Sequence, residues 1–431
     1  MTLPPTVSGA KPLVGHAVEF LRNPDRLIRR GFEEHGTMFS VRLPGGPGVV
    51  LLGPERGRFM FGEADSRLSI KDAYPFLKHM FTKVYWLEER KEYLRQREIL
   101  VPQFTGKHIA GQLDLMDRKA TEFIDALPAE GEFDLVEAFG PLLMDIAAAS
   151  FLGVDVATRI DGFFDVFRRF SGGVDPVTPG WVPLPHIVRS HRARDVLRRK
   201  CTELIEDRKL NPPAESDFLQ TLATAVYADT KEPVPDDVLV SLLLILLWVG
   251  HDTTIAHLSW AMIDLLRHPL ELKKVMAEVE HTTAVDVKTM RRLVHLDNAL
   301  HETERLHPST NGVVRRATEP IDYDGYHFPK GTMVMLHQGV SHRLPEVFPE
   351  PDEFIPDRFS DEPKKKQALY GFGGGFHRCL GENFVYLELK VIITRLLQRL
   401  DLELIDSDPQ PMTGQQTRWP QSPCRVRYVK R

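Results

Sequence analysis

The sequence predicts a mainly α-helical protein with a small β-rich region, and three observations support this fold class. Most of the 431 residues follow the spacing of apolar side chains that is typical of helices. The β-rich runs are short and meet at glycine- and proline-containing turns. A hydrophobic content of 42% is enough for a large core. Length alone suggests about three domains of roughly 150 residues, but no linker or change of composition divides the chain, so we expect one domain over residues 1–431.

The first predicted elements are a helix and two hairpins. The helix begins at Asn23-Pro24 and runs to about Glu34. Pairs of β-rich runs around turn residues predict the hairpins. The pairs are Met38–Leu43 with Val49–Leu52, and Ile321–Tyr323 with Tyr326–Phe328 around Asp324-Gly325.

Composition excludes several classes of protein. The net charge is -5 with acids and bases mixed along the chain, which argues against nucleic acid as a partner. The longest apolar run, Val238 to Val249, is shorter than the ~20 residues of a membrane span. Cys201, Cys379 and Cys424 are too far apart for a disulfide framework or a Cys-x-x-Cys site. We therefore expect a cytoplasmic protein without a membrane anchor.

A long central helix is predicted to start after Pro235, with Asp236 or Asp237 as its N-cap. Residues Val238 to Val249 are apolar on all sides, so this helix should cross the core. The sequence Gly-His-Asp-Thr-Thr at 250–254 then places polar groups where they are costly unless bonded or functional. A threonine hydroxyl can bond the carbonyl four residues earlier and bend the helix, which would open a groove for a small ligand. The alternative is a polar patch where the helix reaches the surface.

A second helix is predicted from about Met290 to His307, with Pro308 ending it. It carries Glu302 and Arg305 three positions apart, on one face. On a surface such a pair contributes only about 0.2–0.5 kcal/mol.

Residues 372–381 read FGGGFHRCLG and precede a predicted helix that runs to about Leu400. A thiol at a helix N-terminus lies beside the positive end of the dipole and unpaired N–H groups, which should lower the pKa of Cys379. The glycines allow the backbone to approach something large and flat. The alternative is a buried structural cysteine in a glycine-rich loop.

The loop fits the pattern Phe-x-x-Gly-x-x-x-Cys-x-Gly and resembles the haem-binding loop of the cytochrome P450 superfamily. That resemblance implies the P450 fold and haem b (iron protoporphyrin IX), with Cys379 as the thiolate ligand of the iron. Phe372, Gly373 and Gly381 would form the cradle for the haem.

Three further motifs appear in the order that this superfamily has. Asp252-Thr253 resembles its oxygen groove, in which Thr253 would hydrogen-bond dioxygen and Asp252 would relay protons. His251 is expected to be a neighbour rather than a ligand. The motif Glu-x-x-Arg at 302–305 and the segment Pro-x-Arg-Phe at 356–359 imply a buried charge network. Its members would be Glu302, Arg305 and Arg358.

Residues 73–81, 173–176 and 423–428 resemble the sterol 14α-demethylase family more narrowly. That likeness implies that cationic and hydroxyl side chains contact the two haem propionates. These side chains would be Tyr74, Arg90, Arg95, Arg315 and His377. Without the likeness, Arg90 and Arg95 are ordinary solvated charges of a helix.

The chain departs from that family at four positions. His79, Thr82, Asp252 and Phe376 stand where the family usually has Pro, Gly, His and Arg. The oxygen groove has the general monooxygenase form. We therefore expect a relative of the sterol demethylases that acts on a different lipophilic molecule.

Aromatic and apolar residues near these motifs are candidates for the substrate pocket, although each is equally compatible with an ordinary core position. They are Phe76, Leu77, Phe81, Trp248, Val249 and Val313. The segment from Ser171 to Pro185 is irregular and is either a lid or a plain surface loop.

The function expected from these features is that of a haem-thiolate monooxygenase. Electrons would come from a separate ferredoxin or flavodoxin with its reductase, because the chain has no flavin or nicotinamide fingerprint. A basic surface from Lys364–Lys366, Arg378 and Lys390 would either dock this partner or be a plain run of solvated charge. Alternatives are a sterol 14α-demethylase, a haem-thiolate enzyme that does not activate oxygen, and a haem sensor or carrier. The Asp252-Thr253 pair argues against the last two.

Overall fold

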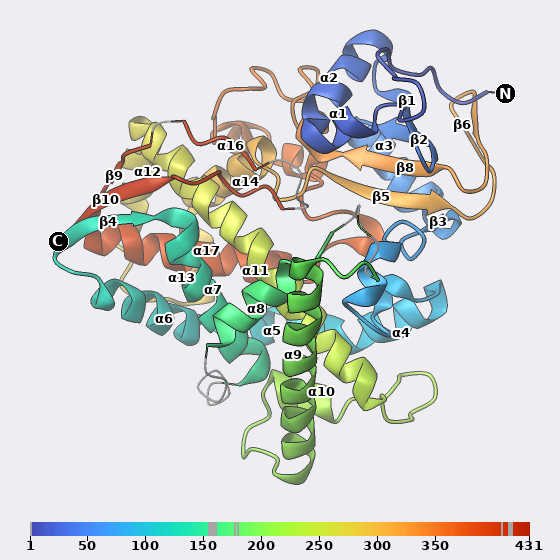
Figure 1. Cartoon of the computed structure of the whole chain (residues 1–431). Coiled ribbons are helices and arrows are strands. Elements are labelled where there is room, and N and C mark those ends of the chain that lie inside the picture. The colour runs from blue at the N-terminus through green and yellow to red at the C-terminus, as the bar shows by residue number, and fades with distance from the viewer. Residues whose placement is uncertain (1, 154–161, 176–177, 179–180, 407, 413–416) are drawn as a thin grey trace.

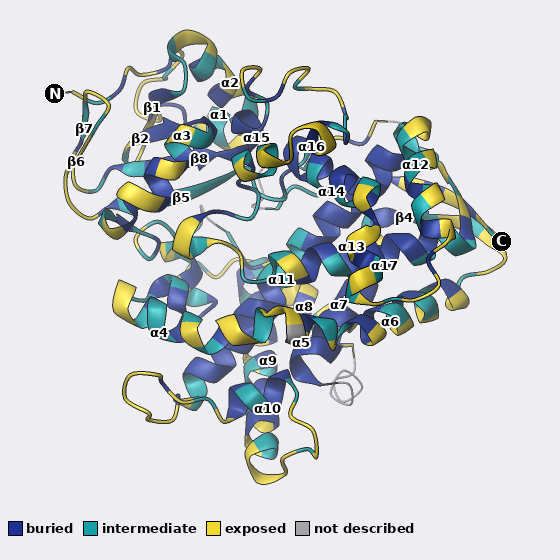
Figure 2. Cartoon of the chain, turned by 180° about the vertical axis from the view of Figure 1, so that it is seen from behind, coloured by how far each residue is buried: buried dark blue, intermediate teal, exposed yellow. Residues whose placement is uncertain are grey.

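The molecule is organised around one long helix, α11 (Asp236–Arg267), which crosses its centre in the computed structural model (Figure 1). Helix α7 (Leu135–Leu152) packs along α11, and α17 (Glu382–Arg399) lies nearby. Figure 2 shows all three mostly in the colour of buried residues, so they form the core that positions everything else. The structure describes residues 2–153, 162–175, 178, 181–406, 408–412 and 417–431.

Most of the other described α-helices surround this core, whereas α1, α2 and α3 lie with the β-rich region at the edge where the chain begins (Figure 1). These other helices are α1 (Ala17–Arg22), α2 (Pro24–His35), α3 (Gly53–Arg58), α4 (Arg90–Leu100), α5 (Gly106–Ala110), α6 (Leu113–Ala126), α8 (Phe163–Ser171), α9 (Pro185–Leu210), α10 (Phe218–Ala223), α12 (Pro269–Glu280), α13 (Val287–Arg292), α14 (Val294–Leu306), α15 (Gln338–Ser341) and α16 (Arg358–Asp361). Short 3-10 or π turns occupy Phe59–Glu63, Asp65–Arg67, Pro75–His79, Tyr85–Leu87, Val101–Phe104, Pro363–Ala368 and Gly375–His377.

Three sheets are formed by the described strands. The largest has the order β1-β2-β8-β5-β3, in which only β2 and β8 are parallel. A second sheet, β4-β10-β9, joins the chain's C-terminal end to the start of α7, and β6 pairs with β7. The strands are β1 (Met38–Leu43), β2 (Gly46–Leu51), β3 (Leu68–Ser69), β4 (Glu130–Asp134), β5 (Gly312–Ala317), β6 (Ile321–Tyr323), β7 (Tyr326–Phe328), β8 (Met333–His337), β9 (Leu400–Leu404) and β10 (Arg425–Lys430).

The hairpins and the first helix are confirmed. β1 pairs with β2, and β6 pairs with β7. The turn between β6 and β7 has positive φ at Asp324 (49°) and Gly325 (79°), a conformation that this dipeptide tolerates. Helix α2 begins where expected, and the Asn23 side chain caps it by accepting the N–H of Arg26.

Three expectations at helix ends are wrong. The N-cap of α11 is Pro235, and the two aspartates stand in the first turn, where carboxylates favour the helix dipole. The helix predicted over 290–307 is divided into α13 and α14 by Leu293, whose ψ of 72° is not helical. Cys379 does not lie at a helix terminus, because Gly381 is the N-cap of α17.

Two helices are long and apolar enough to cross a membrane by length and composition alone. They are α7 and α11, and 72% of the apolar window of each is buried inside the structure. Burial of this extent is what the core helices of a folded protein show, so the test is weak evidence for a span.

Candidate active site

The loop before Cys379 is shaped by its glycines. Gly373 and Gly375 have φ of +73° and +56°, which other residues rarely adopt. A Cβ on Gly374 would lie 2.7 Å from the Phe61 ring, so the loop also packs too closely there for a side chain. The N–H of Cys379 donates to the Phe372 carbonyl at 2.8 Å, which closes the loop, and Cys379 as a residue remains exposed although protein atoms surround its thiol.

The thiol does not have the lowered pKa that a helix terminus would give. Desolvation by the surrounding protein is the largest influence and raises the pKa of Cys379. Hydrogen bonding to the Gly381 backbone and the charges of Arg97 and Arg378 act in the opposite direction but are weaker.

A charge network lies behind this loop. The Glu302 carboxylate accepts two hydrogen bonds from Arg305, both at 2.8 Å, and one from Arg358 at 2.9 Å. The side chains of Glu302 and Arg305 are completely buried. Arg305 also donates to the carbonyls of His342, Pro351 and Glu353. The structure therefore joins the three charged residues that the sequence motifs suggested, and through them α14 holds the segment that leads to the loop.

A second buried acid, which the sequence did not single out, holds the loop from the same helix. Glu304 accepts the N–H of Gly371 at 3.0 Å and the hydroxyl of Tyr386 in α17 at 2.6 Å. Gly371 is required here, because a Cβ on it would lie 2.5 Å from a Glu304 carboxylate oxygen. Burial raises the pKa of Glu304 to about 7.

A polar cluster on the other side of the loop contains most of the residues predicted to contact propionates. His377 Nδ1 lies 2.7 Å from the Tyr93 hydroxyl, and its Nε2 lies 2.6 Å from an Asp65 oxygen without hydrogen-bond alignment. The other Asp65 oxygen accepts from Arg90 at 2.8 Å. Asp65 and Tyr93 had no signal in the sequence, since each is brought here only by the fold.

Arg315 and Tyr74 complete this cluster. The Tyr74 hydroxyl accepts the N–H of Val314 at 3.1 Å. Arg315 is buried, and desolvation lowers its pKa while Tyr74, Tyr93 and Asp65 oppose that effect. No ion pair joins the Arg315 guanidinium to a carboxylate in the part of the chain that the structure describes. A buried and unneutralised cation of this kind favours an anionic ligand.

Arg95 does not join the cluster. It pairs with Glu92 and Asp229, and its guanidinium lies 3.7 Å from the centre of the Tyr227 ring. Arg97, half a helical turn further along α4, instead donates to the Arg378 carbonyl at 3.0 Å, beside Cys379. Positions 95 and 97 point in different directions because each residue turns an α-helix by about 100°.

The polar residues of α11 face two sides. Thr253 lies four positions after Val249 and four before His257, whose ring centre is 6.2 Å from that of Phe372. The Thr253 side of the helix therefore faces the Cys379 loop. The hydroxyls of Thr253 and Thr254 donate to the carbonyls of Val249 and Gly250, as the sequence analysis anticipated.

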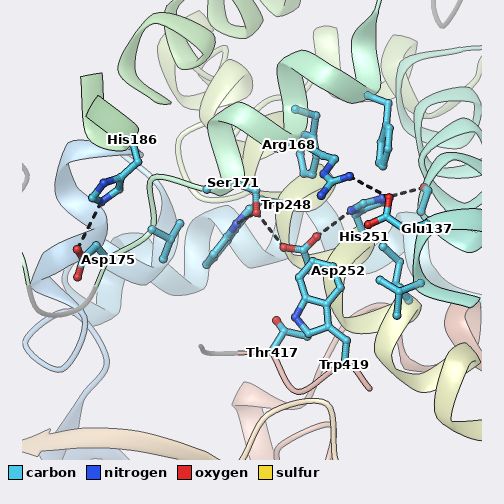
Figure 3. Close-up of a pocket in the computed structure, with 17 residues that line it drawn as sticks. Glu137, Arg168, Ser171, Asp175, His186, Trp248, His251, Asp252, Thr417 and Trp419 are labelled. Atoms are coloured by element: carbon cyan, nitrogen blue, oxygen red, sulfur yellow. Dashed lines mark hydrogen bonds and ion pairs between the residues drawn. The ribbon is translucent and has the colours of Figure 1, made fainter. Parts of the chain in front are cut away.

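Asp252 faces a cavity of about 470 Å³ between α7, α8, α11 and residues 417–419 (Figure 3). Its carboxylate lies between His251 and Ser171. Pairs of charged residues, Glu137 with Arg168 and Asp175 with His186, line the same cavity.

Only one of the candidate pocket residues, Trp248, lines this cavity. Leu77 and Phe81 are fully buried in the main core, where the Phe81 ring packs on Trp248 at 5.4 Å. Phe76 and Val249 are partly buried against the same core, and Val313 packs against the apolar cluster of the large sheet.

The structure bears on the hypothesis of a basic docking surface but not on all of the segment proposed as a lid. Most of the basic residues are neutralised by acids: Lys365 by Glu362, Lys366 and Lys390 by Asp297, and Arg378 by Glu382. Lys390 is also buried, so it cannot contribute to a docking surface. The lid hypothesis concerns a segment of which residues 176–177 and 179–180 lie outside the described residues.

A comparison with family models now decides the family. The model described as Cytochrome P450 matches residues 4–427. The chain belongs to the cytochrome P450 family. It is therefore a haem-thiolate monooxygenase that uses haem b, with the P450 fold.

Similar proteins agree with this assignment. The chain is 31% identical to a sterol 14α-demethylase of Mycolicibacterium vanbaalenii, over 99% of this chain and 98% of that protein. It is 28% identical to the human lanosterol 14-alpha demethylase, over 94% and 82%. Among solved structures, the cyanobacterial CYP120A1 bound to retinoic acid superposes with a TM-score of 0.89 at 25% identity, over 100% of both chains.

The residues of this P450 fit its cofactor. Cys379 offers a thiol on a loop whose glycines permit close approach, and the buried Arg315 offers an unneutralised charge for a propionate. Tyr93 and Arg97 add a hydroxyl and a cation near this set, whereas the Asp65 carboxylate pairs with Arg90 and lies against His377. Of that set, Arg95 alone is directed elsewhere.

Proposed function

We propose that this P450 oxidises, and most often hydroxylates, a C–H bond of a lipophilic small molecule such as a terpenoid, steroid, polyketide or fatty acid. Haem b, bound through Cys379, supplies the iron centre at which dioxygen is activated. The protein's own residues hold the haem, exclude water and deliver protons. Because one family model spans residues 4–427, we also propose that residues 1–431 form one domain.

The observation that supports oxygen activation is the position of two adjacent residues of α11. Thr253 stands on the side of the helix that faces the Cys379 loop, and Asp252 stands on the side that faces the cavity. The Asp252 side chain is 16% exposed, so it can exchange protons with solvent in the cavity. The Thr253 hydroxyl, on the side of α11 that faces the Cys379 loop, would pass a proton toward the haem when that group is bound.

The electron donor in this proposal is a ferredoxin or flavodoxin with its own reductase. Arg97 and Lys91 of α4 and Lys364 have no acid within ion-pair distance in the described part of the chain, so they are better candidates for contacting an acidic partner than the neutralised lysines. Cys201, Cys379 and Cys424 are free thiols, which suits a reducing cytoplasm.

A second candidate function is sterol 14α-demethylation. It is favoured by the similarity to the demethylases of M. vanbaalenii and human over almost the whole chain. It is disfavoured by Asp252 and His79, which depart from the pattern of that family.

The experiment begins by titrating the purified ferric protein with candidate substrates while the haem absorption band is recorded. A saturable low-to-high-spin shift with a 14α-methyl sterol would favour the demethylase candidate. A shift with terpenoids, polyketides or fatty acids only would favour the first proposal.

The proton role is then tested with the best substrate and a surrogate redox chain. Thr253→Ala should lower the product formed per electron pair about tenfold and release peroxide instead, because a positioned proton donor is lost. Thr254→Ala is the matched control, because its hydroxyl makes the same backbone bond but is buried away from the loop. Equal coupling in Thr253→Ala and wild type would contradict the proton role.

A further inference from the structure

His251 has acceptors at both of its ring nitrogens. Its Nε2 lies 2.9 Å from the Gly140 carbonyl of α7, and its Nδ1 lies 2.9 Å from an Asp252 carboxylate oxygen. A carbonyl oxygen can only accept a hydrogen bond, so Nε2 must carry a proton. The contact between Nδ1 and Asp252 holds one further proton, which lies on Nδ1 when the carboxylate is ionised.

The protonation state of Asp252 depends also on its second carboxylate oxygen, which faces Ser171. The Trp248 indole N–H, which can only donate, points at the Ser171 hydroxyl oxygen at 3.2 Å. The proton of Ser171 is then free to go to Asp252, whose second oxygen lies 2.8 Å away. Asp252 therefore accepts a hydrogen bond at this oxygen, and its other oxygen faces His251 Nδ1, an arrangement that suits an ionised carboxylate (Figure 3).

We infer that His251 and Asp252 form an imidazolium–carboxylate pair that stores one proton beside the oxygen-activating side of α11. His251 is 2% exposed, and the rings of Phe164 and Phe167 lie 5.7 and 5.2 Å from its ring. Both residues line the cavity, and Asp252 is the more exposed of the two, at 16%. The other charged or titratable residues that line the cavity also lie in pairs: Glu137 with Arg168 at 3.3 Å, and Asp175 with His186 at 3.6 Å.

This inference rests on the proposed function, in which Asp252 passes protons to Thr253. In the step, the proton on His251 Nδ1 moves to Asp252, and Asp252 gives up one proton toward the Thr253 hydroxyl. His251 becomes neutral and keeps its Nε2 proton on the Gly140 carbonyl. A proton from water in the cavity then restores the pair, so one proton enters for each proton delivered. Ser171 is a positioning residue, because it orients the carboxylate from the end of α8.

A second buried histidine of α11, His257, can be compared with His251. His257 is also buried, at 3% exposure, and its Nε2 also lies 2.9 Å from a backbone carbonyl, that of Leu300. No acid is bonded to its Nδ1 among the described residues. Burial lowers the pKa of His257 to about 4, so it is neutral at pH 7. The two histidines differ chiefly in the presence of Asp252.

The first test locates the protons without using activity. Haem-loaded protein labelled with ¹⁵N-histidine is reduced and saturated with carbon monoxide, and the ring nitrogens are observed by NMR at pH 7. His251→Gln and His257→Gln identify the two sets of signals. We expect protons on both nitrogens of His251 and on Nε2 alone of His257. We expect Asp252→Asn to make His251 resemble His257. An unprotonated His251 Nδ1 in the wild type would overturn the inference.

The second test measures the consequence for turnover. His251→Gln should lower the product formed per electron pair about tenfold and enlarge the solvent deuterium isotope effect, whereas His257→Gln should change neither. If Thr253→Ala and Asp252→Asn uncouple the enzyme but His251→Gln does not, the relay stands and the proton store is wrong. If none of the three variants changes coupling, the proposed function itself fails.

Discussion

Two groups of buried charge, one within α11 and one on α14 and the segment that follows it, are built differently. In the network of Glu302, Arg305 and Arg358, every carboxylate oxygen is bonded and the side chains of Glu302 and Arg305 are completely buried. In the pair of His251 and Asp252, the carboxylate is bonded as well but remains 16% exposed to a cavity. The comparison indicates that a completely buried group of charges stabilises a loop, whereas a group with one partly exposed carboxylate can exchange protons with solvent. We call these the closed group and the open group.

The largest expected loss of stability comes from removing Glu302, the acid of the closed group. Glu302→Ala leaves two buried guanidinium groups without their acid, which should lower the free energy of unfolding by about 3–5 kcal/mol. Asp252→Asn keeps the shape and one acceptor oxygen at a partly exposed site, so it should lower the free energy of unfolding by less than about 1 kcal/mol. Urea unfolding of the haem-loaded proteins measures both. Equal losses would remove the distinction between the two groups.

A smaller effect on stability is expected from Glu304, which is buried like the Glu302 network but binds a proton in the pH range of interest. Burial raises its pKa from 4.5 to about 7, so the folded protein binds more protons than the unfolded chain in this range. The free energy of unfolding should therefore fall as pH rises from about 4.5 to about 7, by roughly 3 kcal/mol from this group.

Glu304→Gln should remove that part of the slope and be more stable than wild type above pH 7. Unfolding midpoints measured at intervals between pH 5 and 8 check this expectation. Glu388, whose pKa burial raises to about 8, will keep a slope in the variant, and Glu388→Gln is the control for it. Parallel pH profiles of wild type and Glu304→Gln would show that Glu304 is ionised throughout.

The smallest effect compares two arginines of one helix. Arg97→Ala removes a charged hydrogen bond to the carbonyl of Arg378 and should destabilise the Cys379 loop by about 1.5 kcal/mol. The ferrous carbon-monoxide spectrum should then lose its red-shifted thiolate band faster than in wild type. Arg95→Ala is the matched control, because it removes partly exposed ion pairs worth about 0–1 kcal/mol and a contact with the Tyr227 ring, none of which involves the Cys379 loop. Similar spectra for the two variants would contradict the assignment of Arg97 to the loop.

The sequence by itself determined the parts whose residues are close along the chain. Glu302 and Arg305 share one helical turn, Asp252 and Thr253 are adjacent, and the glycines lie within six residues of Cys379. In each case a short stretch of backbone brings the side chains together, so spacing alone carries the information. The hairpins and the mainly helical class follow from the same local rules.

Tertiary structure decided whatever depends on which distant segments meet. Asp65 reaches His377, Ser171 reaches Asp252, and Gly140 accepts from His251, across 312, 81 and 111 positions of the chain. The choice of Arg97 over Arg95 also depends on the side of α4 that faces the loop. No local pattern encodes these contacts, because they arise when the helices pack to bury their apolar faces, and the polar groups are then matched across the interfaces that result.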